Sequence, residues 1–190
     1  MNSDSERGRL GRLTTLKRRI PPRGDLVPVF AACIFVVFSW SIVIFLYKLP
    51  GWLKFLDAWT IAGILAYELL FSLLESTLSF GLLLGLAILL PGSWLRNRFA
   101  VQGTLLVLLL AFWAGLLNGA TSVQLWSELQ LLLGAALILA SIVVCFLLIH
   151  RSRLLNRAVR GLAGRVTAFL YVYLPLSALS LIVIVVRNVR

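Results

Sequence analysis

Long apolar stretches alternate with short polar segments along most of this chain. A helix needs about 20 apolar residues to cross the roughly 30 Å hydrocarbon core of a bilayer. Five stretches meet that length or come close to it: Leu26–Tyr47, Ala58–Leu90, Val101–Leu117, Leu129–Ile149 and Val166–Val186. Because the segments between them are short, we expect one all-α, five-span transmembrane domain over residues 26–190, preceded by a basic arm over residues 1–25.

The second stretch is too long for a simple perpendicular span. A helix from Ala58 to Leu90 would be about 50 Å long. Either this helix is strongly tilted, or its start lies along the outer interface. The second alternative is favoured by aromatic residues that prefer headgroup depth, namely Trp52, Trp59 and Tyr67. Asp57 is a suitable N-cap for a helix beginning at Ala58.

Composition excludes a soluble protein. Hydrophobic residues make up 61% of the chain and the mean hydropathy is +0.99, whereas soluble domains are about 45–50% apolar. The chain has one His and two Cys, Cys33 and Cys145, both inside apolar stretches. No metal-ligand spacing, phosphate-binding loop or nucleophile motif is present in the sequence. We therefore predict no cofactor, no metal site and no catalytic residue.

Basic residues fall mainly on alternate connections. Seven precede the first stretch, two follow the second and five follow the fourth: Arg7, Arg9, Arg12, Lys17, Arg18, Arg19, Arg23; Arg96, Arg98; Arg151, Arg153, Arg157, Arg160, Arg165. The other four are Lys48, Lys54, Arg187 and Arg190. Because Lys and Arg favour cytoplasmic loops, this bias predicts an N-terminus inside and a C-terminus outside the cytoplasmic (inner) membrane.

The net charge of +11 is concentrated at these membrane boundaries, where it meets anionic headgroups. No nucleic-acid-binding motif accompanies it, so we do not expect nucleic acid as a partner.

Two basic segments have the pattern of amphipathic interfacial helices. In the arm, the apolar positions Leu10, Leu13, Leu16 and Ile20 recur near a helical period, although a disordered tail fits equally well. After the fourth span, an apolar face is formed by Leu154, Leu155, Ala158, Val159 and Leu162. Four arginines beside that face are candidate contacts for anionic lipid: Arg151, Arg153, Arg157 and Arg160. We expect Gly161 and Gly164 to turn the chain into the fifth span.

One polar line runs along the second span. Glu68 and Glu75 are two helical turns apart, with Ser72 and Ser79 on the same stripe. Counting about 20 residues from Pro91 places Glu75 roughly 7 Å inside the hydrocarbon, where a charge is costly. Candidate partners at the outer ends of other spans are Asn118, Gln130 and Arg187.

We expect Glu75 to be protonated, hydrogen-bonded to a neighbouring span or paired with Arg187. Its role is either structural, tying spans together, or functional, relaying protons or ions or contacting a substrate.

Small residues at four-residue spacing allow close helix approach, within the chain or with another subunit. The candidate packing positions are Gly81, Gly85, Gly115 and Gly119.

These features favour a non-catalytic accessory, anchoring or assembly subunit. Its partners would be membrane lipids, including anionic headgroups, and another membrane protein. A small transporter or lipid-handling protein that uses the cluster around Glu75 is the alternative, and a membrane-embedded enzyme is the third. A transporter should place Glu75 in a polar cavity. A scaffold should bury it against a span or point it toward a missing partner.

Overall fold

The computed structural model describes residues 22–89, 99–121 and 128–189, and all regular structure in these ranges is α-helix. The helices are α2 (Arg23–Trp52), α3 (Ala58–Leu89), α4 (Phe99–Thr121), α5 (Glu128–Arg151), α6 (Arg153–Thr167) and α7 (Leu170–Val189). The helix proposed for the N-terminal arm lies outside the described residues.

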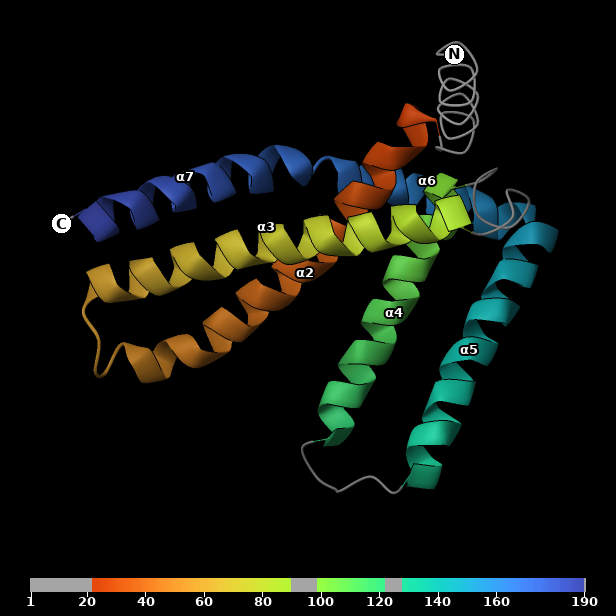
Figure 1. The fold of residues 1–190 in the computed structure, drawn as a ribbon, viewed down its shortest axis with the longest axis horizontal. Coiled ribbons are helices and arrows are strands. Elements are labelled where there is room, and N and C mark those ends of the chain that lie inside the picture. The colour runs from red at the N-terminus through yellow and green to blue at the C-terminus, as the bar shows by residue number, and fades with distance from the viewer. Residues whose placement is uncertain (1–21, 90–98, 122–127, 190) are drawn as a thin grey trace, which may run out of the picture.

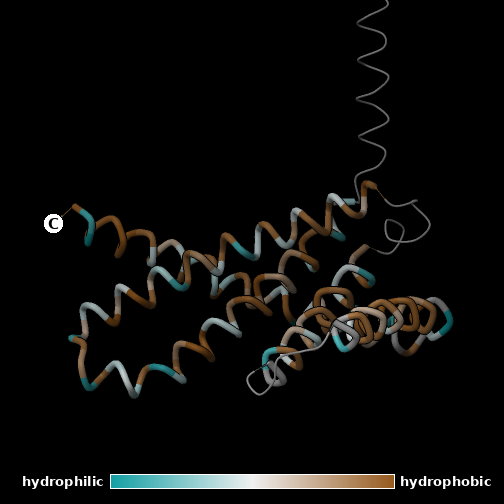
Figure 2. Tube along the Cα trace, turned by 60° about the horizontal axis from the view of Figure 1, so that its bottom comes forward, coloured by the Kyte–Doolittle hydropathy of each residue, from teal (hydrophilic) through white to brown (hydrophobic). Residues whose placement is uncertain are grey.

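Five described segments are long and apolar enough to cross a membrane, which confirms the predicted number of spans. They contain α2, α3, α4 and α5, and a last segment that runs through α6 into α7. Hydrophobic positions dominate along the helices, and hydrophilic positions gather near the bends and ends (Figure 2). The chain is therefore a multi-pass membrane protein.

The helices form two limbs that meet at one end and diverge toward the other (Figure 1). One limb, the long limb, consists of α2, α3 and α7, which contact one another. The second limb is the hairpin of α4 and α5. Helix α6 lies where the limbs meet and contacts α2, α4, α5 and α7. We call this junction the α6 end of the molecule.

Two packed clusters hold the junction together. The first joins α2, α3 and α4 through Val29, Cys33, Leu83, Phe99 and Leu106, among other residues. The second joins α2, α3, α6 and α7, and includes Phe38, whose ring is tilted against that of Tyr173 with 4.7 Å between the ring centroids. Beyond these clusters α4 and α5 expose most of their side chains, because the limbs have separated.

Asp57 caps α3 as predicted. Its carboxylate accepts hydrogen bonds from the backbone N–H of Thr60 (3.1 Å) and from the Thr60 hydroxyl (2.6 Å). From this cap α3 runs unbroken for 32 residues to Leu89. An unbroken helix favours a tilted span over a separate segment lying along the interface.

The expected start of the last span is wrong. Val166 belongs to α6, and the chain turns at Ala168–Phe169 before α7 begins at Leu170. Gly161 and Gly164 do not turn the chain; both lie inside α6 with no neighbour within 4 Å of a built β-carbon. The helix continues past them because residues further along still pack at helical spacing against the bundle.

Candidate functional site

A buried polar contact joins α2 to α3. The hydroxyl of Ser72 lies 2.7 Å from the hydroxyl of Ser41 and 2.7 Å from the carbonyl oxygen of Glu68. Because a carbonyl only accepts, Ser72 gives its hydrogen to Glu68 and can receive the hydrogen of Ser41. Ser76, one turn further on, is fully buried and donates to the Ser72 carbonyl (2.6 Å). Small hydroxyl side chains therefore bring the two helices close without leaving unpaired groups.

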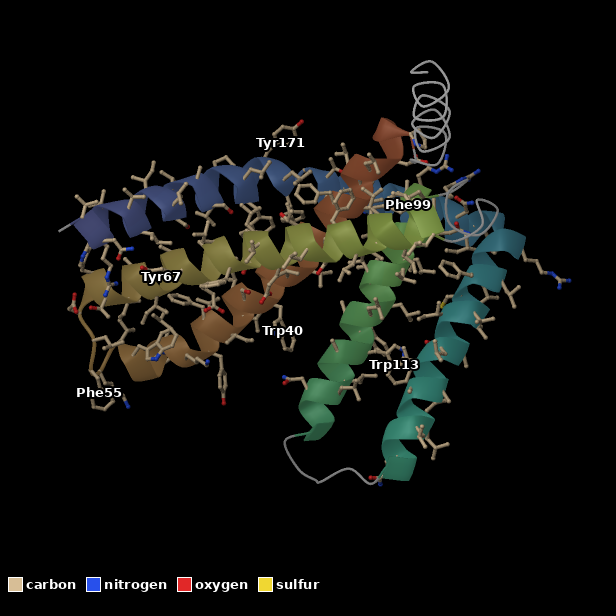
Figure 3. All side chains as sticks on the ribbon, in the orientation of Figure 1. Trp40, Phe55, Tyr67, Phe99, Trp113 and Tyr171 are labelled. Carbon is tan, nitrogen blue, oxygen red and sulfur yellow. The ribbon has the colours of Figure 1, made fainter. Side chains whose placement is uncertain are left out.

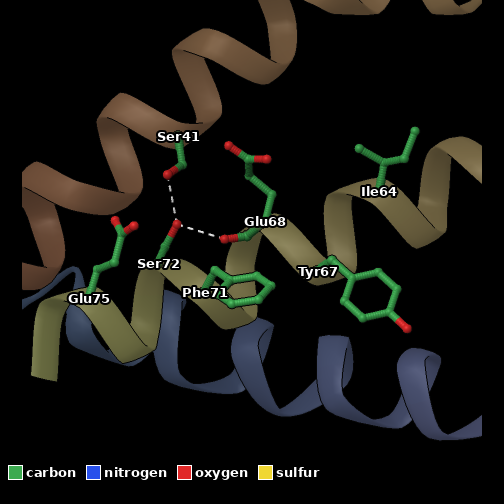
Figure 4. A pocket seen from close by; sticks show the side chains of 7 residues that line it. All are labelled: Ser41, Ile64, Tyr67, Glu68, Phe71, Ser72 and Glu75. Atoms are coloured by element: carbon green, nitrogen blue, oxygen red, sulfur yellow. Dashed lines mark hydrogen bonds between the residues drawn. The ribbon is translucent and has the colours of Figure 1, made fainter.

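Both glutamates of α3 flank this contact. Figure 4 shows Glu68 and Glu75 on the side of α3 that faces α2, on either side of the Ser41–Ser72 hydrogen bond. Together with Ile64, Tyr67 and Phe71 these residues line an open groove of about 400 Å³. We call this hollow the glutamate groove. It brings together three residues of the predicted polar cluster, namely Glu68, Ser72 and Glu75.

Glu75 is exposed at the edge of the glutamate groove. Among the described residues it forms no hydrogen bond or ion pair. The expected bond to a neighbouring span and the expected pair with Arg187 are therefore both wrong, while protonation stays a prediction. The physical reason is that the helix facing Glu75 is α2, whose hydroxyl at Ser41 is already bonded to Ser72.

Arg187 instead lies against the start of α3. A β-carbon added to Gly63 would be 2.8 Å from Cζ of Arg187, so the guanidinium occupies the space left by the missing side chain. One residue further, Asn188 accepts a hydrogen bond from the Tyr67 hydroxyl (3.4 Å). These contacts fasten the end of α7 to α3, about two to three turns before Glu75.

Asn118 and Gln130 belong to the other limb. They lie in the last turn of α4 and the first turn of α5, and neither lines the glutamate groove. The predicted six-residue cluster is thus divided among three places: the groove, the end of α7 and the tip of the hairpin. Ser79 also lies elsewhere, in an apolar hollow of about 320 Å³ between α2, α3 and α4.

No family model, curated protein or solved structure matches this chain.

A second polar contact, which the sequence did not reveal, holds the hairpin. The indole of Trp113 in α4 donates to the Ser141 hydroxyl of α5 (3.0 Å), and Ser141 donates to the carbonyl of Ile138 (2.7 Å). Figure 3 shows Trp113 between the two helices. An aromatic residue opposite a lone serine in apolar spans is the only sequence signal for such a pair.

The glycines predicted to pack helices do not do so within the described part of the chain. Gly81, Gly85 and Gly115 have nothing within 4 Å of a built β-carbon, and the surroundings of Gly119 are not described. The prediction that these glycines pack helices within the chain is wrong for these three positions, because they face away from the helices that α3 and α4 contact. Packing against another subunit stays a prediction.

The basic residues at the α6 end are accessible. Arg151, Arg157, Arg160 and Arg165 are all exposed. The side chains of Arg153 and Leu155 lie outside the described ones. Val159, expected on a lipid-facing surface, instead packs with Val101 and Ile149. The predicted helix therefore exists, but part of its apolar face belongs to the bundle.

Titratable chemistry is sparse. No group of three or more His, Cys, Asp or Glu in the described ranges is placed to hold a metal ion, and Cys33 and Cys145 are free thiols. Asp57 lies outside the spans, and its pKa is lowered below the usual 3.8. The main cause is the hydrogen bond from the Thr60 side chain, and the second is the hydrogen bond from the Thr60 backbone.

Proposed function

We propose that this protein is a non-catalytic assembly or anchoring subunit of the cytoplasmic membrane that binds another membrane protein through the glutamate groove. The observation that carries this proposal is the position of Glu75. Its carboxylate is exposed along a groove in a membrane-spanning helix and lacks a partner among the described residues.

The depth of Glu75 makes the missing partner energetically important. Glu75 lies about 25 Å along α3 from Ala58 and about 21 Å from Leu89, at 1.5 Å per residue. A helix placed symmetrically in the bilayer would therefore hold Glu75 close to the midplane, deeper than a count from Pro91 indicates. An acidic side chain there costs roughly 2.5–3.5 kcal/mol if it faces lipid alone.

A cationic partner would remove this cost. Lysine and arginine are absent from the interiors of all five predicted spans, so a second copy of this chain cannot supply the cation from mid-membrane. A transmembrane helix of a different protein, with a Lys or Arg near the midplane, has the required chemistry. Ile64, Tyr67 and Phe71, which all precede Glu75 on α3, offer such a helix apolar surface on one side of the charge.

Charge distribution supports the orientation in which the α6 end faces the cytoplasm. The exposed arginines Arg151, Arg157, Arg160 and Arg165 lie in helices that meet at the α6 end. Lys48 and Arg187 lie near the other ends of α2 and α7, and Lys54 lies in the turn between α2 and α3. By the positive-inside rule the N-terminus would be inside and the C-terminus outside.

A photo-crosslinking experiment tests the partner. p-Benzoylphenylalanine in place of Phe71, which lines the groove, should crosslink to the transmembrane helix of another protein, and mass spectrometry should find Lys or Arg in the linked peptide. The same probe at Leu137 of α5, on the other limb, is the control position, where this crosslink is not expected.

Substitutions make the experiment specific. Glu75→Leu should abolish the Phe71 crosslink, because the charge is lost, and Glu75→Gln should weaken it. Thr77→Val is the matched control, since Thr77 is exposed on the same helix and its hydroxyl bonds only to Leu73 of its own helix (2.8 Å). A crosslink that survives Glu75→Leu unchanged would refute the proposal.

A small transporter or lipid-handling protein is the second candidate. It is favoured by two carboxylates sharing one groove, an arrangement able to hold a cation or an amine headgroup. In that case Glu75→Gln would stop transport in reconstituted vesicles while every protein partner is retained. A membrane-embedded enzyme has no supporting observation among the described residues.

A further inference from the structure

Helix α6 occupies a distinct place in the molecule. It lies at the junction of the two limbs and contacts helices of both, α2 and α7 of the long limb and α4 and α5 of the hairpin. A ligand bound to α6 would therefore act where the limbs are joined.

Three stripes run along α6. Val159, Ala163 and Val166 are buried at i, i+4 and i+7, and form the side that faces the bundle. With about 100° of rotation per residue, an apolar stripe and a cationic stripe lie on opposite flanks of this buried stripe.

The apolar flank stripe consists of Leu154, Ala158 and Leu162 at i, i+4 and i+8. All three are exposed, Leu154 to 79% and Leu162 to 43%. The cationic flank stripe consists of Arg157 and Arg160, which are exposed and three residues apart. In the described part of the chain neither arginine forms an ion pair or hydrogen bond.

This order of stripes matches a helix lying in the plane of a membrane surface. When the buried stripe points sideways into the bundle, the apolar flank faces the acyl chains and the arginines face the headgroups. Arg165 follows Leu162 by three residues and so ends the apolar flank, in the last turn, where a positive charge is favourable beside the free carbonyls of the helix end.

We infer that α6 is a binding site for anionic phospholipid, in which Arg157 and Arg160 contact the headgroup phosphates and Leu154, Ala158 and Leu162 contact the acyl chains. The apolar flank decides in favour of a lipid over a soluble phosphate, because a free anion would gain nothing from it. Guanidinium groups pair with phosphate oxygens through directed hydrogen bonds. The inference is independent of the glutamate groove.

The test uses the full chain in nanodiscs with increasing fractions of phosphatidylglycerol in phosphatidylcholine, and follows the thermal unfolding temperature. Anionic lipid should raise this temperature for the native protein. For R157Q/R160Q the midpoint of the rise should shift to a higher fraction of phosphatidylglycerol, or the rise should disappear. Because both leaflets hold the same lipid, the result does not depend on membrane orientation.

Matched variants distinguish a specific lipid-binding site from general electrostatic attraction to anionic lipid. K48Q/K54Q removes the same number of charges from exposed residues at the opposite end, and should keep the native response. R157K/R160K retains charge and should keep most of it. In pure phosphatidylcholine all variants should unfold at the native temperature, which shows that they are folded.

Two results would overturn the inference. One is an equal loss of response in K48Q/K54Q, which would indicate general electrostatic attraction. The other is an equal stabilisation of the protein in phosphatidylcholine nanodiscs by inorganic phosphate, which would indicate a site for a soluble anion.

Discussion

Val29 of α2 packs directly on the backbone of α4 at Gly103. A β-carbon at position 103 would lie 2.9 Å from Cγ2 and 3.1 Å from Cγ1 of Val29. Val29 is fully buried, and its branched side chain has little rotamer freedom in a helix. This contact therefore sets the distance between α2 and α4 where the two limbs meet.

Gly103→Ala should lower the free energy of unfolding by about 1–3 kcal/mol, because the methyl group forces the helices apart. SDS-induced unfolding in mixed micelles, followed by circular dichroism, measures this. Gly81→Ala is the control, since position 81 has open space around it and alanine is the better helix former. Equal stability of the two variants would show that Gly103 does not set the spacing.

The Trp113–Ser141 bond should stabilise the hairpin. Ser141→Ala leaves the indole N–H without its acceptor, and we expect a loss of roughly 0.5–1.5 kcal/mol in the same unfolding assay. Trp113→Phe removes the donor, so the double variant should cost less than the sum of the single ones. Additive losses would mean that the two side chains act separately. Thr77→Val controls for loss of a hydroxyl bonded only within its own helix.

Span number was predictable because bilayer thickness requires about 20 apolar residues, whatever their packing. Capping by Asp57 was predictable because its effect is local. The path of α6 was not. The glycines at 161 and 164 suggested a turn, but long-range packing of Val159, Ala163 and Val166 kept the helix continuous.

Helix faces were harder to predict than helix positions. In lipid both the packed and the lipid-facing sides are apolar, so hydrophobic periodicity is weak. Glycine spacing pointed to Gly81 and Gly85, whereas the close contacts are at Gly63 and Gly103. Polar residues inside the spans would have been the better signal, since Gln102 and Thr104 flank Gly103 and the structure buries both.

The proposed orientation predicts the behaviour of reporter fusions. Alkaline phosphatase, which is active only outside the cytoplasm, should be active when fused after Leu56 or Arg190 and inactive after Ser152. A fluorescent protein that folds only in the cytoplasm should give the reverse pattern. Phosphatase activity after Ser152 would place α6 outside and reverse the orientation.

The cap of α3 should weaken in acid. The hydrogen bonds from Thr60 favour the ionised carboxylate of Asp57, so its pKa is lower in the folded protein than the usual 3.8. A lowered folded pKa means that the stabilisation is fully present above pH 3.8 and is lost as the pH falls through the folded value. Hydrogen exchange at the backbone amides of Thr60 and Ile61, measured in nanodiscs, should show the first turn of α3 opening in that range, apart from the intrinsic pH dependence of exchange.

Asp57→Asn can still cap the helix but does not titrate, so its first turn should not open further in acid. Thr60→Val removes the side-chain hydrogen bond, which is the larger cause of the lowered pKa. The first turn of α3 should then open at a higher pH, nearer 3.8. An opening with the same pH dependence in Asp57→Asn would assign the effect to another group.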